Sequence, residues 1–521
     1  MRSAKRTKVK KGTTVKKRTT VKKAKRGAAK KKASARAKPA RKPRATAATA
    51  AAGGVLLVNI IPKSLSSETN QDSEPMIAVN PANTNQIVAT AFTPDPLESG
   101  SAPYFVSTDG GKTWSLNTTV PGGDMTGDIT VAFSGTGPAL YASILRQDSP
   151  DTSTRMAILR TTDFSAPTPM DVMEDRQQPD QPFAQATTVA NGAAAGKQRL
   201  YVGSNDFAAG SSTATLDIAL DAAAPAPGFK KVRLERRSTG GAGQDGPQVR
   251  TSIHADGTVY ATFYGWRSQT GNWPANTLKV AADVVVVRDD KWGDNPTPFE
   301  SLTDSADGVV GHRVAKNVTF SFNRNGLAAN GQQRLGGTLS IAVDPRPGKS
   351  GTVYVAWGTD QGGFAIHVRK STDRGVTWSA SDLLTVPRGT NAALAVNADG
   401  VVGLLYQQLT GANPAQRWET HLRRSANGGT SWSDDLTLAT TPATTPARSF
   451  DPYLGDYDHM LAVGRDFYGI FSASNVPDMT HFPNGVTYQR NADFATRKLL
   501  DVNNLNSVTS SIDPFFFKVS A

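Results

Sequence analysis

One ten-residue phrase occurs three times in this chain, and a larger unit repeats around it. The phrase reads VSTDGGKTWS at 106–115, KSTDRGVTWS at 370–379 and RSANGGTSWS at 424–433. Apolar segments recur mostly 50 to 65 residues apart, and they begin at residues 75, 128, 183, 248, 339, 392 and 459. Each has two β-branched or aromatic runs around a Gly, Asn or Pro turn, which is typical of a β-hairpin. Internal repeats of this length predict a fold made of similar units.

A second hairpin follows most of these segments, so each unit predicts a four-stranded antiparallel sheet. Six or seven such sheets cover one another when they pack radially as a β-propeller, and we favour seven over six. Long amphipathic helical patterns are absent from this part of the sequence. We therefore predict an all-β chain with a single propeller at 55–521, an insertion loop near 293–335, and a basic tail at 1–54.

The tail differs in composition from the rest of the chain. Residues 1–44 contain 21 Lys and Arg and no Asp or Glu, which leaves 37 basic and 44 acidic residues elsewhere, a net charge of −7. Only three Val, and no Leu, Ile or aromatic residue, precede Val55, so we predict disorder. The repeated units TKVKKG, TTVKKR and TTVKKA supply the candidate polyanion-binding residues, which are Lys10, Lys11, Lys16, Lys17, Lys22 and Lys23.

The expected partner of this tail is a polyanion, either nucleic acid or an anionic envelope or lipid surface; a solubilising leader is the alternative. The apolar segment at 51–61 is interpreted as a first strand rather than as an export signal, which leaves the compartment open between the cytoplasm and non-classical export. The chain has no cysteine, which excludes disulfides and thiolate chemistry. No apolar stretch is long enough to span a bilayer, and we expect a monomer.

The repeated phrase fits a turn motif, Ser-x-Asp-x-Gly-x-Thr-Trp. Asp or Asn accepts hydrogen bonds from nearby backbone amides, Gly adopts conformations that other residues resist, and Trp buries area between sheets. We therefore predict a structural role for the motif residues, which are Ser107, Asp109, Gly111, Trp114, Ser371, Asp373, Gly375, Trp378, Ser425, Asn427, Gly429 and Trp432.

This motif resembles the Asp box, or BNR repeat, of sialidase-like propellers, and the resemblance covers about residues 60–520. It is closest to bacterial BNR-repeat proteins without assigned activity. The resemblance implies a propeller with the boxes on its rim. Sialidases also carry an Arg-Ile-Pro motif, an arginine triad, a Tyr–Glu pair and an Asp acid/base. Here NIIP at 59–62 has Ile61 in place of the arginine, and only Arg250 is placed as a triad-like arginine, so no catalytic residue is carried over.

Acidic residues stand just before several inner strands, whose ends meet at one mouth of a propeller's channel. Such a ring binds a divalent cation, holds a cationic or polyhydroxyl ligand, or supplies a glycosidase's acid and nucleophile. The alternative is that each residue only caps a turn. The candidate residues at this mouth are Glu74, Asp128, Asp180, Asp245, Arg250, Asp456, Tyr457 and Asp458.

Two functions remain. The first is a non-catalytic propeller that binds a glycan or protein ligand at its mouth or serves as a scaffold. The second is a sialidase-like glycoside hydrolase with an altered site. The incomplete arginine set favours the first. No cofactor is required, and calcium at the mouth is the one candidate; the six histidines form no His-x-x-x-His pair, so no other metal is assigned.

Overall fold

The computed structural model describes residues 54–520 except for 93–100, 103, 118–119, 122–124, 148–153, 241–245, 247–248, 273–274, 276, 323–333, 336 and 447–452. The tail at 1–53, with its six candidate lysines, and Asp245 lie outside the described residues. All elements below belong to the unit at 49–521, which is distinct from residues 1–48.

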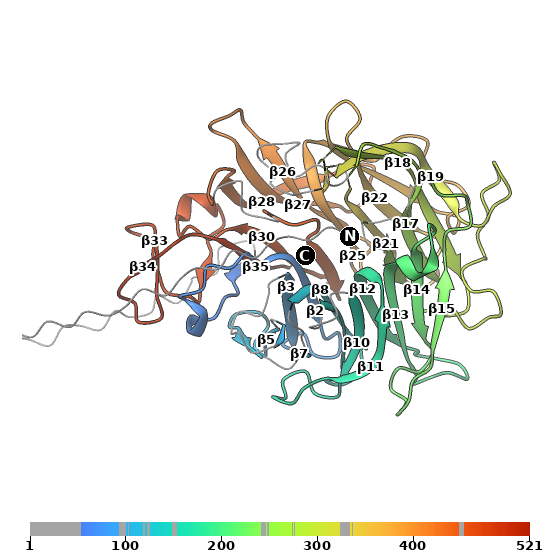
Figure 1. Cartoon of the computed structure of the whole chain (residues 1–521), viewed down its shortest axis with the longest axis horizontal. Helices are drawn as coiled ribbons and strands as arrows, with labels where there is room; N and C mark the ends of the chain where they lie inside the picture. The colour runs from blue at the N-terminus through green and yellow to red at the C-terminus, as the bar shows by residue number, and fades with distance from the viewer. Residues whose placement is uncertain are drawn as a thin grey trace, which may run out of the picture. The chain divides into compact units, whose positions relative to one another are not determined.

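The regular secondary structure of the described residues is almost entirely β, and the first four large sheets follow one another in sequence (Figure 1). The first sheet contains β2 (Ser73–Val79), β3 (Ile87–Phe92), β5 (Phe105–Ser107) and β6 (Ser115–Leu116). The second contains β8 (Met125–Phe133), β9 (Leu140–Gln147), β10 (Arg155–Thr161) and β11 (Asp171–Gln177). The third contains β12 (Pro179–Thr188), β13 (Gln198–Asp206), β14 (Ala214–Ala219) and β15 (Phe229–Arg233). The fourth contains β16 (Arg250–Ile253), β17 (Val259–Thr270), β18 (Leu278–Asp289), β19 (His312–Phe322) and β20 (Arg334–Leu335).

Three further large sheets complete the body. The fifth contains β21 (Leu339–Val343), β22 (Val353–Thr359), β23 (Ala365–Ser371) and β24 (Leu384–Pro387). The sixth contains β25 (Gly389–Val396), β26 (Val402–Thr410), β27 (Arg417–Ser425) and β28 (Ser433–Pro442). The seventh contains β29 (His459–Val463), β30 (Asp466–Ser474), β35 (Ile512–Val519), β1 (Val55–Asn59) and β31 (Thr487–Tyr488).

The small elements connect or extend these sheets. They are the pair β4 (Ser101–Ala102) and β7 (Val120–Pro121), the small sheet β32 (Ala492–Asp493), β33 (Lys498–Leu500) and β34 (Ser507–Val508), and the 3-10 helices η1 (Lys63–Leu65), η2 (Phe207–Ala209) and η3 (Met479–His481). Among the described residues, no helix is long and apolar enough to cross a membrane.

The first strands of successive sheets lie next to one another in order, and the first strand of the seventh sheet contacts that of the first. Within each large sheet the neighbouring strands run antiparallel, apart from the parallel edge pair β1–β31. Apolar clusters fill the spaces between adjacent sheets; one of them joins Val88 of the first sheet to Ile129 and Leu159 of the second. This is the radial arrangement of a β-propeller, so the predicted all-β propeller is confirmed, while the number of blades and the disorder of the tail stay predictions.

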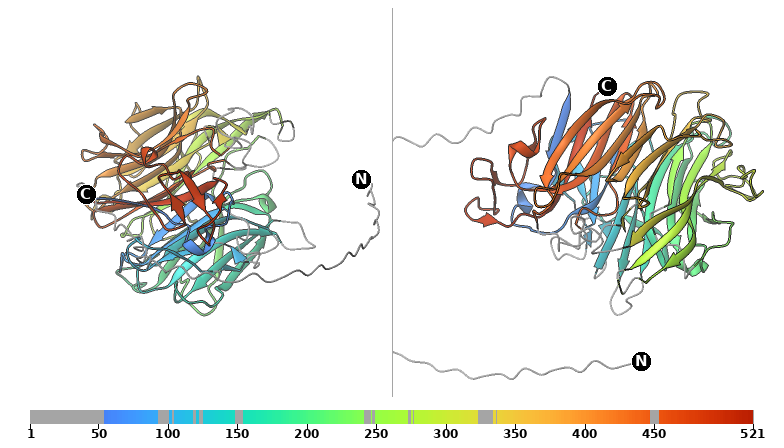
Figure 2. Two further views of the ribbon diagram at one scale, coloured as in Figure 1. Left: turned by 90° about the vertical axis from the view of Figure 1, so that its left-hand side faces the viewer. Right: turned by 90° about the horizontal axis from the view of Figure 1, so that it is seen from above.

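The seventh sheet differs from the prediction in composition. The apolar segment at its start does form a strand, β1, but β1 pairs with the last strand, β35, with Val55 opposite Val519 and Asn59 opposite Phe515. Between β30 and β35 the chain inserts residues 475–511, which carry β31 to β34 and project from this sheet (Figures 1 and 2). The predicted insertion near 293–335 is partly regular structure, because β19 occupies its centre.

The Asp boxes are the turns between the third and fourth strands of the first, fifth and sixth sheets. In each box the Ser hydroxyl accepts a hydrogen bond from the Gly amide, at 2.9 Å for Gly111 and 2.8 Å for Gly375 and Gly429. Asp373 accepts bonds from the amide (2.9 Å) and hydroxyl (2.5 Å) of Thr377. In the third box Asn427 accepts from the Ser431 amide at 2.9 Å, so an amide side chain serves the same turn.

Each box tryptophan packs on the preceding sheet. Trp114 meets Phe516 of the seventh sheet with 5.4 Å between ring centroids, and Trp378 packs against the apolar cluster shared by the fourth and fifth sheets. Trp432 donates its indole N–H to the Leu383 carbonyl of the fifth sheet at 3.2 Å. A Cβ at Gly111 would lie 2.0 Å from the Phe516 ring, so glycine is required there. The boxes thus fix both a turn and a contact between sheets.

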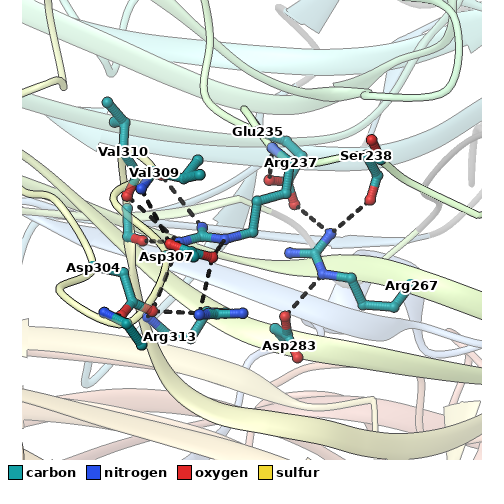
Figure 3. A network of polar contacts seen from close by, with 12 residues as sticks. Glu235, Arg237, Ser238, Arg267, Asp283, Asp304, Asp307, Val309, Val310 and Arg313 are labelled. Atoms are coloured by element: carbon teal, nitrogen blue, oxygen red, sulfur yellow. Dashed lines mark hydrogen bonds and ion pairs between the residues drawn. The ribbon is translucent and has the colours of Figure 1, made fainter.

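A network of ion pairs holds the connection between the third and fourth sheets (Figure 3). Arg237 binds both carboxylate oxygens of Asp307, at 2.8 and 3.0 Å, and donates to the Gly311 carbonyl at 2.8 Å. Arg313 joins Asp304 and Asp307 at 2.8 and 2.9 Å. Arg237 lies on the segment between β15 and β16. Its contacts therefore fix this segment to the loop that precedes β19.

The box geometry gives a stability prediction. Burial raises the pKa of Asp373, but hydrogen bonds from Thr377 and Ser371 outweigh it and hold this pKa below its usual value. Asp373→Ala removes these bonds and is expected to lower the free energy of unfolding by about 1–2 kcal/mol at neutral pH. Asp373→Asn is expected to cost less than about 0.5 kcal/mol, because Asn427 already serves the third box.

Urea unfolding midpoints at matched slopes measure both effects. Because the pKa is depressed in the folded chain, the extra stability is present above the unfolded pKa of about 4 and is lost as pH falls below it. Equal losses for the Ala and Asn variants would contradict this account of the turn.

Candidate functional site

The predicted mouth residues lie at the start of the inner strands. Glu74, Asp128 and Asp180 lie in β2, β8 and β12, and Arg250 is the first residue of β16. Asp456, Tyr457 and Asp458 end the connection that leads into β29. In a four-stranded antiparallel sheet, the start of the first strand and the turn from third to fourth strand lie at opposite ends, so the site and the Asp boxes face opposite ways.

Bulges re-aim the side chains at the start of four inner strands. The pairing register shifts between Ser73 and Met76, and equivalent shifts occur in β8, β12 and β25. The first unpaired residue has a positive φ at Glu74 (53°), Gln181 (52°) and Asn391 (54°), which is uncommon for residues other than glycine. Bulges of this kind turn side chains toward sites that a regular strand would not reach.

Two mouth carboxylates hold the connection before β29. Tyr457 donates its hydroxyl to Asp128 at 2.7 Å, and the Asp456 amide donates to Glu74 at 2.9 Å. Gly455 has φ 78°, and a Cβ there would lie 2.2 Å from the Glu74 side chain. The predicted residues Glu74, Asp128, Asp456 and Tyr457 are therefore brought together.

Arg250 is buried beside this pair, with 6% of its surface exposed. Its guanidinium carbon lies 4.4 Å from the Phe183 ring centroid and 5.1 Å from that of Tyr457. It forms no ion pair with a carboxylate of the described residues, and its Nε has no hydrogen-bond partner there. A buried cation without an ion pair is costly unless something else compensates it.

Burial sets the protonation of the neighbouring groups. It lowers the pKa of Arg250 to about 10, although Tyr457, Asp128 and Glu74 act in the opposite direction. Burial and the Asp128 charge raise the pKa of Tyr457 well above its usual value. Burial and the Arg250 charge lower the pKa of His459 to about 3. At neutral pH the phenol and the imidazole are therefore uncharged, and the guanidinium is charged.

A cavity of about 190 Å³ lies among the inner strands β12, β16, β21, β25 and β29. Three of its lining residues, Arg250, Thr251 and Asp458, are at most 6% exposed. Each has a polar atom without a partner among the described residues: Arg250 Nε, Thr251 Oγ1 and Asp458 Oδ2. Since buried polar groups are nearly always hydrogen-bonded, these atoms mark a place for a polar ligand or water.

The remaining mouth residues have other positions. The Asp180 carboxylate accepts the amide of Gln181 at 2.8 Å, which is the turn-capping role considered as the alternative. Asp245 lies outside the described residues. Ile61, where a sialidase has arginine, is fully buried in an apolar cluster. Arg313 is held by Asp304 and Asp307 and does not line the cavity.

One group of carboxylates in the described part of the chain has the spacing of a metal site, and it lies away from the predicted ring. Glu68, Asp72 and Asp513 each place an oxygen within 4.8 Å of the others. Arg490 forms ion pairs with Glu68 and Asp513, both at 2.8 Å, so a cation already occupies this cluster. Calcium at the predicted mouth stays a prediction.

Comparison with known proteins identifies one of the repeats. Residues 105–116 match the model described as the BNR/Asp-box repeat. These residues run from the start of β5 to the end of β6 and contain the first box. The box therefore lies between the outer strands of its sheet, as the resemblance implies. The chain therefore carries a BNR/Asp-box repeat on a β-propeller fold. No curated protein matches it in sequence.

The solved structures similar to this propeller include two glycosidases and a protein bound to a ribosomal protein segment. An α-L-arabinofuranosidase from Fusarium graminearum is 9% identical over 88% of this chain and 97% of that chain, with a TM-score of 0.36. The Hadza microbial sialidase is 12% identical over 78% and 64%, with a TM-score of 0.35. Sqt1 from Chaetomium thermophilum, bound to the N-terminus of ribosomal protein L10, is 11% identical over 87% and 100%, with a TM-score of 0.36.

Sequence reasoning missed three residues of the propeller's site. Phe183 supplies the ring beneath Arg250, His459 packs edge-on to Phe183 with 5.9 Å between centroids, and Thr251 lines the cavity. Phe183 is the first paired residue after the bulge of β12, and Met76 and Ile129 hold the same position in β2 and β8. A residue at that position has the pattern of ordinary core, so the sequence carries no signal for it.

The Tyr457–Asp128 bond yields a prediction for the propeller. Tyr457→Phe leaves the buried carboxylate without this donor, and we expect a loss of about 1.5–3 kcal/mol in the free energy of unfolding. Tyr104→Phe is the matched control, because the buried Tyr104 hydroxyl donates to the neutral carbonyl of Phe164 at 3.2 Å. Its expected loss is about 0.5–1.5 kcal/mol. Chemical unfolding of the three proteins measures the difference, and a larger loss for the control would refute the importance of the bond.

Proposed function

We propose that this protein is a seven-bladed binding propeller that holds a small polar ligand in the cavity without hydrolysing it. Each of the seven large sheets is taken as one blade. One observation carries the proposal: Arg250, Thr251 and Asp458 line a single cavity, are almost fully buried, and leave polar atoms unpaired among the described residues. A ligand oxygen would satisfy atoms that the described protein groups leave without a partner.

The donors favour an acceptor-rich ligand. Arg250 offers only N–H donors, and Thr251 offers a hydroxyl. A carboxylate or a cluster of sugar oxygens can accept hydrogen bonds from these donors, and a cation cannot. The cavity volume of about 190 Å³ is below the roughly 300–1,000 Å³ of sites that enclose drug-sized molecules. The ligand is therefore a small molecule, or the end group of a glycan or protein segment.

The tyrosine argues against sialidase-type catalysis. A tyrosine nucleophile needs a lowered pKa or an adjacent base ready to take its proton. Tyr457 has a carboxylate within reach, Asp128 at 2.7 Å, but burial and the Asp128 charge raise its pKa well above the usual value, and the phenol does not line the cavity. The cavity is also lined by one arginine of the described residues where sialidases use three, and Ile61 lies in the core.

One observation favours hydrolysis as the second candidate. Burial raises the pKa of Asp458 well above its usual value, and the residue lines the cavity. A carboxyl group with a raised pKa is what a general acid in glycoside hydrolysis requires. An active glycosidase would also need a second carboxylate in reach of the same bond.

A ligand panel tests the proposal. We expect at least one compound among acetate, lactate, D-galactose, L-arabinose, D-glucuronate and N-acetylneuraminate to raise the melting temperature of the full chain. At one hundred times Kd the stabilisation is about 2.7 kcal/mol. Arg250→Leu is expected to abolish the effect. The control Arg465→Leu should retain it, because Arg465 is 70% exposed and pairs with Asp399 on a turn at the opposite end of the sheets.

Fluorogenic glycosides, sialosides included, test the second candidate in parallel. We expect no turnover by the folded full chain. Turnover that Asp458→Asn abolishes would replace the binding proposal with the hydrolase. A panel in which no compound stabilises the wild-type chain, or in which Arg250→Leu changes nothing, would reject the cavity as the site.

We further propose that the basic tail binds a polyanion, with nucleic acid as the preferred class. This proposal is supported by the charge of residues 1–44, which contain 21 basic and no acidic residues. Binding to phosphates releases counterions, so it weakens steeply with added salt. A remainder with net charge −7 is a poor duplex binder by itself.

Replacing the six lysines Lys10, Lys11, Lys16, Lys17, Lys22 and Lys23 with glutamine in the full chain tests the tail. We expect weaker binding to duplex DNA in fluorescence anisotropy. The slope of log K against log salt should become shallower by about 0.9 for every phosphate that the variant no longer neutralises. Replacing six lysines of the propeller, Lys230, Lys279, Lys291, Lys349, Lys370 and Lys498, is the matched control. An equal effect of both sets would show that the tail is not the binding element.

A further inference from the structure

Asp458 has an unusual place in the cavity. It lies between Tyr457 and His459, immediately before β29, and is 2% exposed. Its Oδ1 accepts the Ser472 amide at 3.2 Å. Its Oδ2 has no partner among the described residues, although it belongs to a side chain that lines the cavity. One oxygen of this carboxyl group is thus anchored to β30, and the other is buried at the cavity wall without a hydrogen-bond partner among the described residues.

No cation of the described residues forms an ion pair with Asp458. The charged or titratable residues on the cavity wall are Arg250 on β16 and His459 on β29. Arg250 makes no ion pair with Asp458, and His459 is neutral because its pKa is lowered to about 3. The residue of β30 that bonds Asp458 is the neutral Ser472, through its amide. The Ser472 carbonyl accepts from the neutral Gln407 at 2.7 Å, and Gln407 accepts from the neutral Asn391 at 2.9 Å.

The Tyr457 connection adds no cation either. Tyr457 is a neutral phenol bonded to Asp128, and Glu74 accepts the backbone amide of Asp456. Burial is the dominant influence on Asp458 and raises its pKa well above the usual value, while the Ser472 amide opposes this in part. Asp458 is therefore protonated over a range of pH in which other carboxyl groups are ionised.

We infer that Asp458 binds the ligand as a neutral carboxylic acid, with its Oδ2–H donating a hydrogen bond to a ligand oxygen, so that ligand affinity depends on one proton. This inference rests on the proposed binding function of the cavity. With Arg250 Nε and Thr251 Oγ1, the protonated carboxyl gives the cavity a third donor, which explains why it would select an acceptor-rich group such as a carboxylate.

The sign of the proton linkage follows from the donor role. The ligand stabilises the protonated form, so the pKa of Asp458 rises further on binding. Affinity is then full below the pKa of the free protein and falls above it, by up to tenfold for each pH unit until the pKa of the complex is passed. An ionised Asp458 that bound a cation would give the opposite trend.

Acetate is the probe, because it is the smallest carboxylate on the panel and stays ionised above about pH 6. Isothermal titration of the full chain from about pH 6 to pH 9 should show affinity falling as pH rises. Asp458→Asn should bind acetate within about threefold of the wild-type value at low pH and with no pH dependence. The Asn amide donates at every pH, while its Oδ1 still accepts from Ser472. Asp458→Leu should lose about tenfold or more at low pH.

Circular dichroism and melting temperature confirm that each variant is folded. A flat or rising pH profile in the wild type, or a profile in Asp458→Asn that matches the wild type, would overturn the inference. Failure of acetate to bind the wild-type chain counts against it as well, even when another panel compound binds through Arg250. The Arg250→Leu variant tests whether the cavity is the binding site, whereas the pH profile and the Asp458 variants test the proton linkage. Failure of the proposed function and failure of this inference are therefore distinguishable.

Discussion

The strands that line the centre of this propeller are the inner edges of their sheets, and the hydrogen bonds of those edges govern the rest of the structure. An edge strand presents unpaired N–H groups that need partners. Here the partner is a side chain of the neighbouring inner strand: Thr130 accepts the Ala184 amide at 3.1 Å, and Ser340 accepts the Leu394 amide at 2.9 Å. These edge amides therefore form their hydrogen bonds with side chains of the neighbouring sheet.

The same device recurs at other junctions with different side chains. Ser252 accepts the Val343 amide at 2.9 Å, and Thr338 accepts the Ala392 amide at 2.8 Å. Between the seventh and first sheets the acceptor is an imidazole, because His459 Nδ1 faces the Ile77 amide at 3.4 Å. That bond requires an uncharged ring, which agrees with the lowered pKa of His459. A residue of the site is thus also a link in the ring of sheets.

Closure joins the two ends of the described chain. β1 completes the seventh sheet beside β35, and Asn59 of β1 donates to Asp513 of β35 at 2.7 Å. Arg490, which is fully buried, binds Asp513 and Glu68 at 2.8 Å each and so ties the insertion to both ends. The first Asp box adds the Trp114–Phe516 contact. Breaking one partner of such a buried ion pair leaves an uncompensated charge, which makes closure sensitive to single changes.

The sequence predicted what depends on local pattern. Hairpin repeats and box residues follow short-range rules of strand alternation and turn chemistry, and they indicated the fold class. The place of β1 could not be inferred locally, because its partner Phe515 stands more than four hundred residues away and any apolar segment could open the first sheet. The insertion at 475–511 was missed because its strands are two or three residues long.

The site was predicted in outline and not in detail. Counting back from each inner strand identified Glu74, Asp128, Asp456 and Tyr457 as neighbours, since equivalent ends of radial strands meet. Phe183 and His459 escaped, because an aromatic residue and a histidine in a buried strand have the pattern of core residues. Their role appears only once the bulges set which way each side chain points.

Fold and site share the junction between the seventh and first sheets. Glu74 lies in the bulge of β2 and holds the Asp456 amide, and Gly455 allows the close approach. The segment that this hydrogen bond fixes delivers Tyr457 to Asp128, Asp458 to the cavity and His459 to the edge of β2. A ligand that binds only this arrangement stabilises it by mass action. The arrangement also supplies the His459–Ile77 link, so a ligand in the cavity, as proposed, would favour closure of the ring and closure would favour its binding.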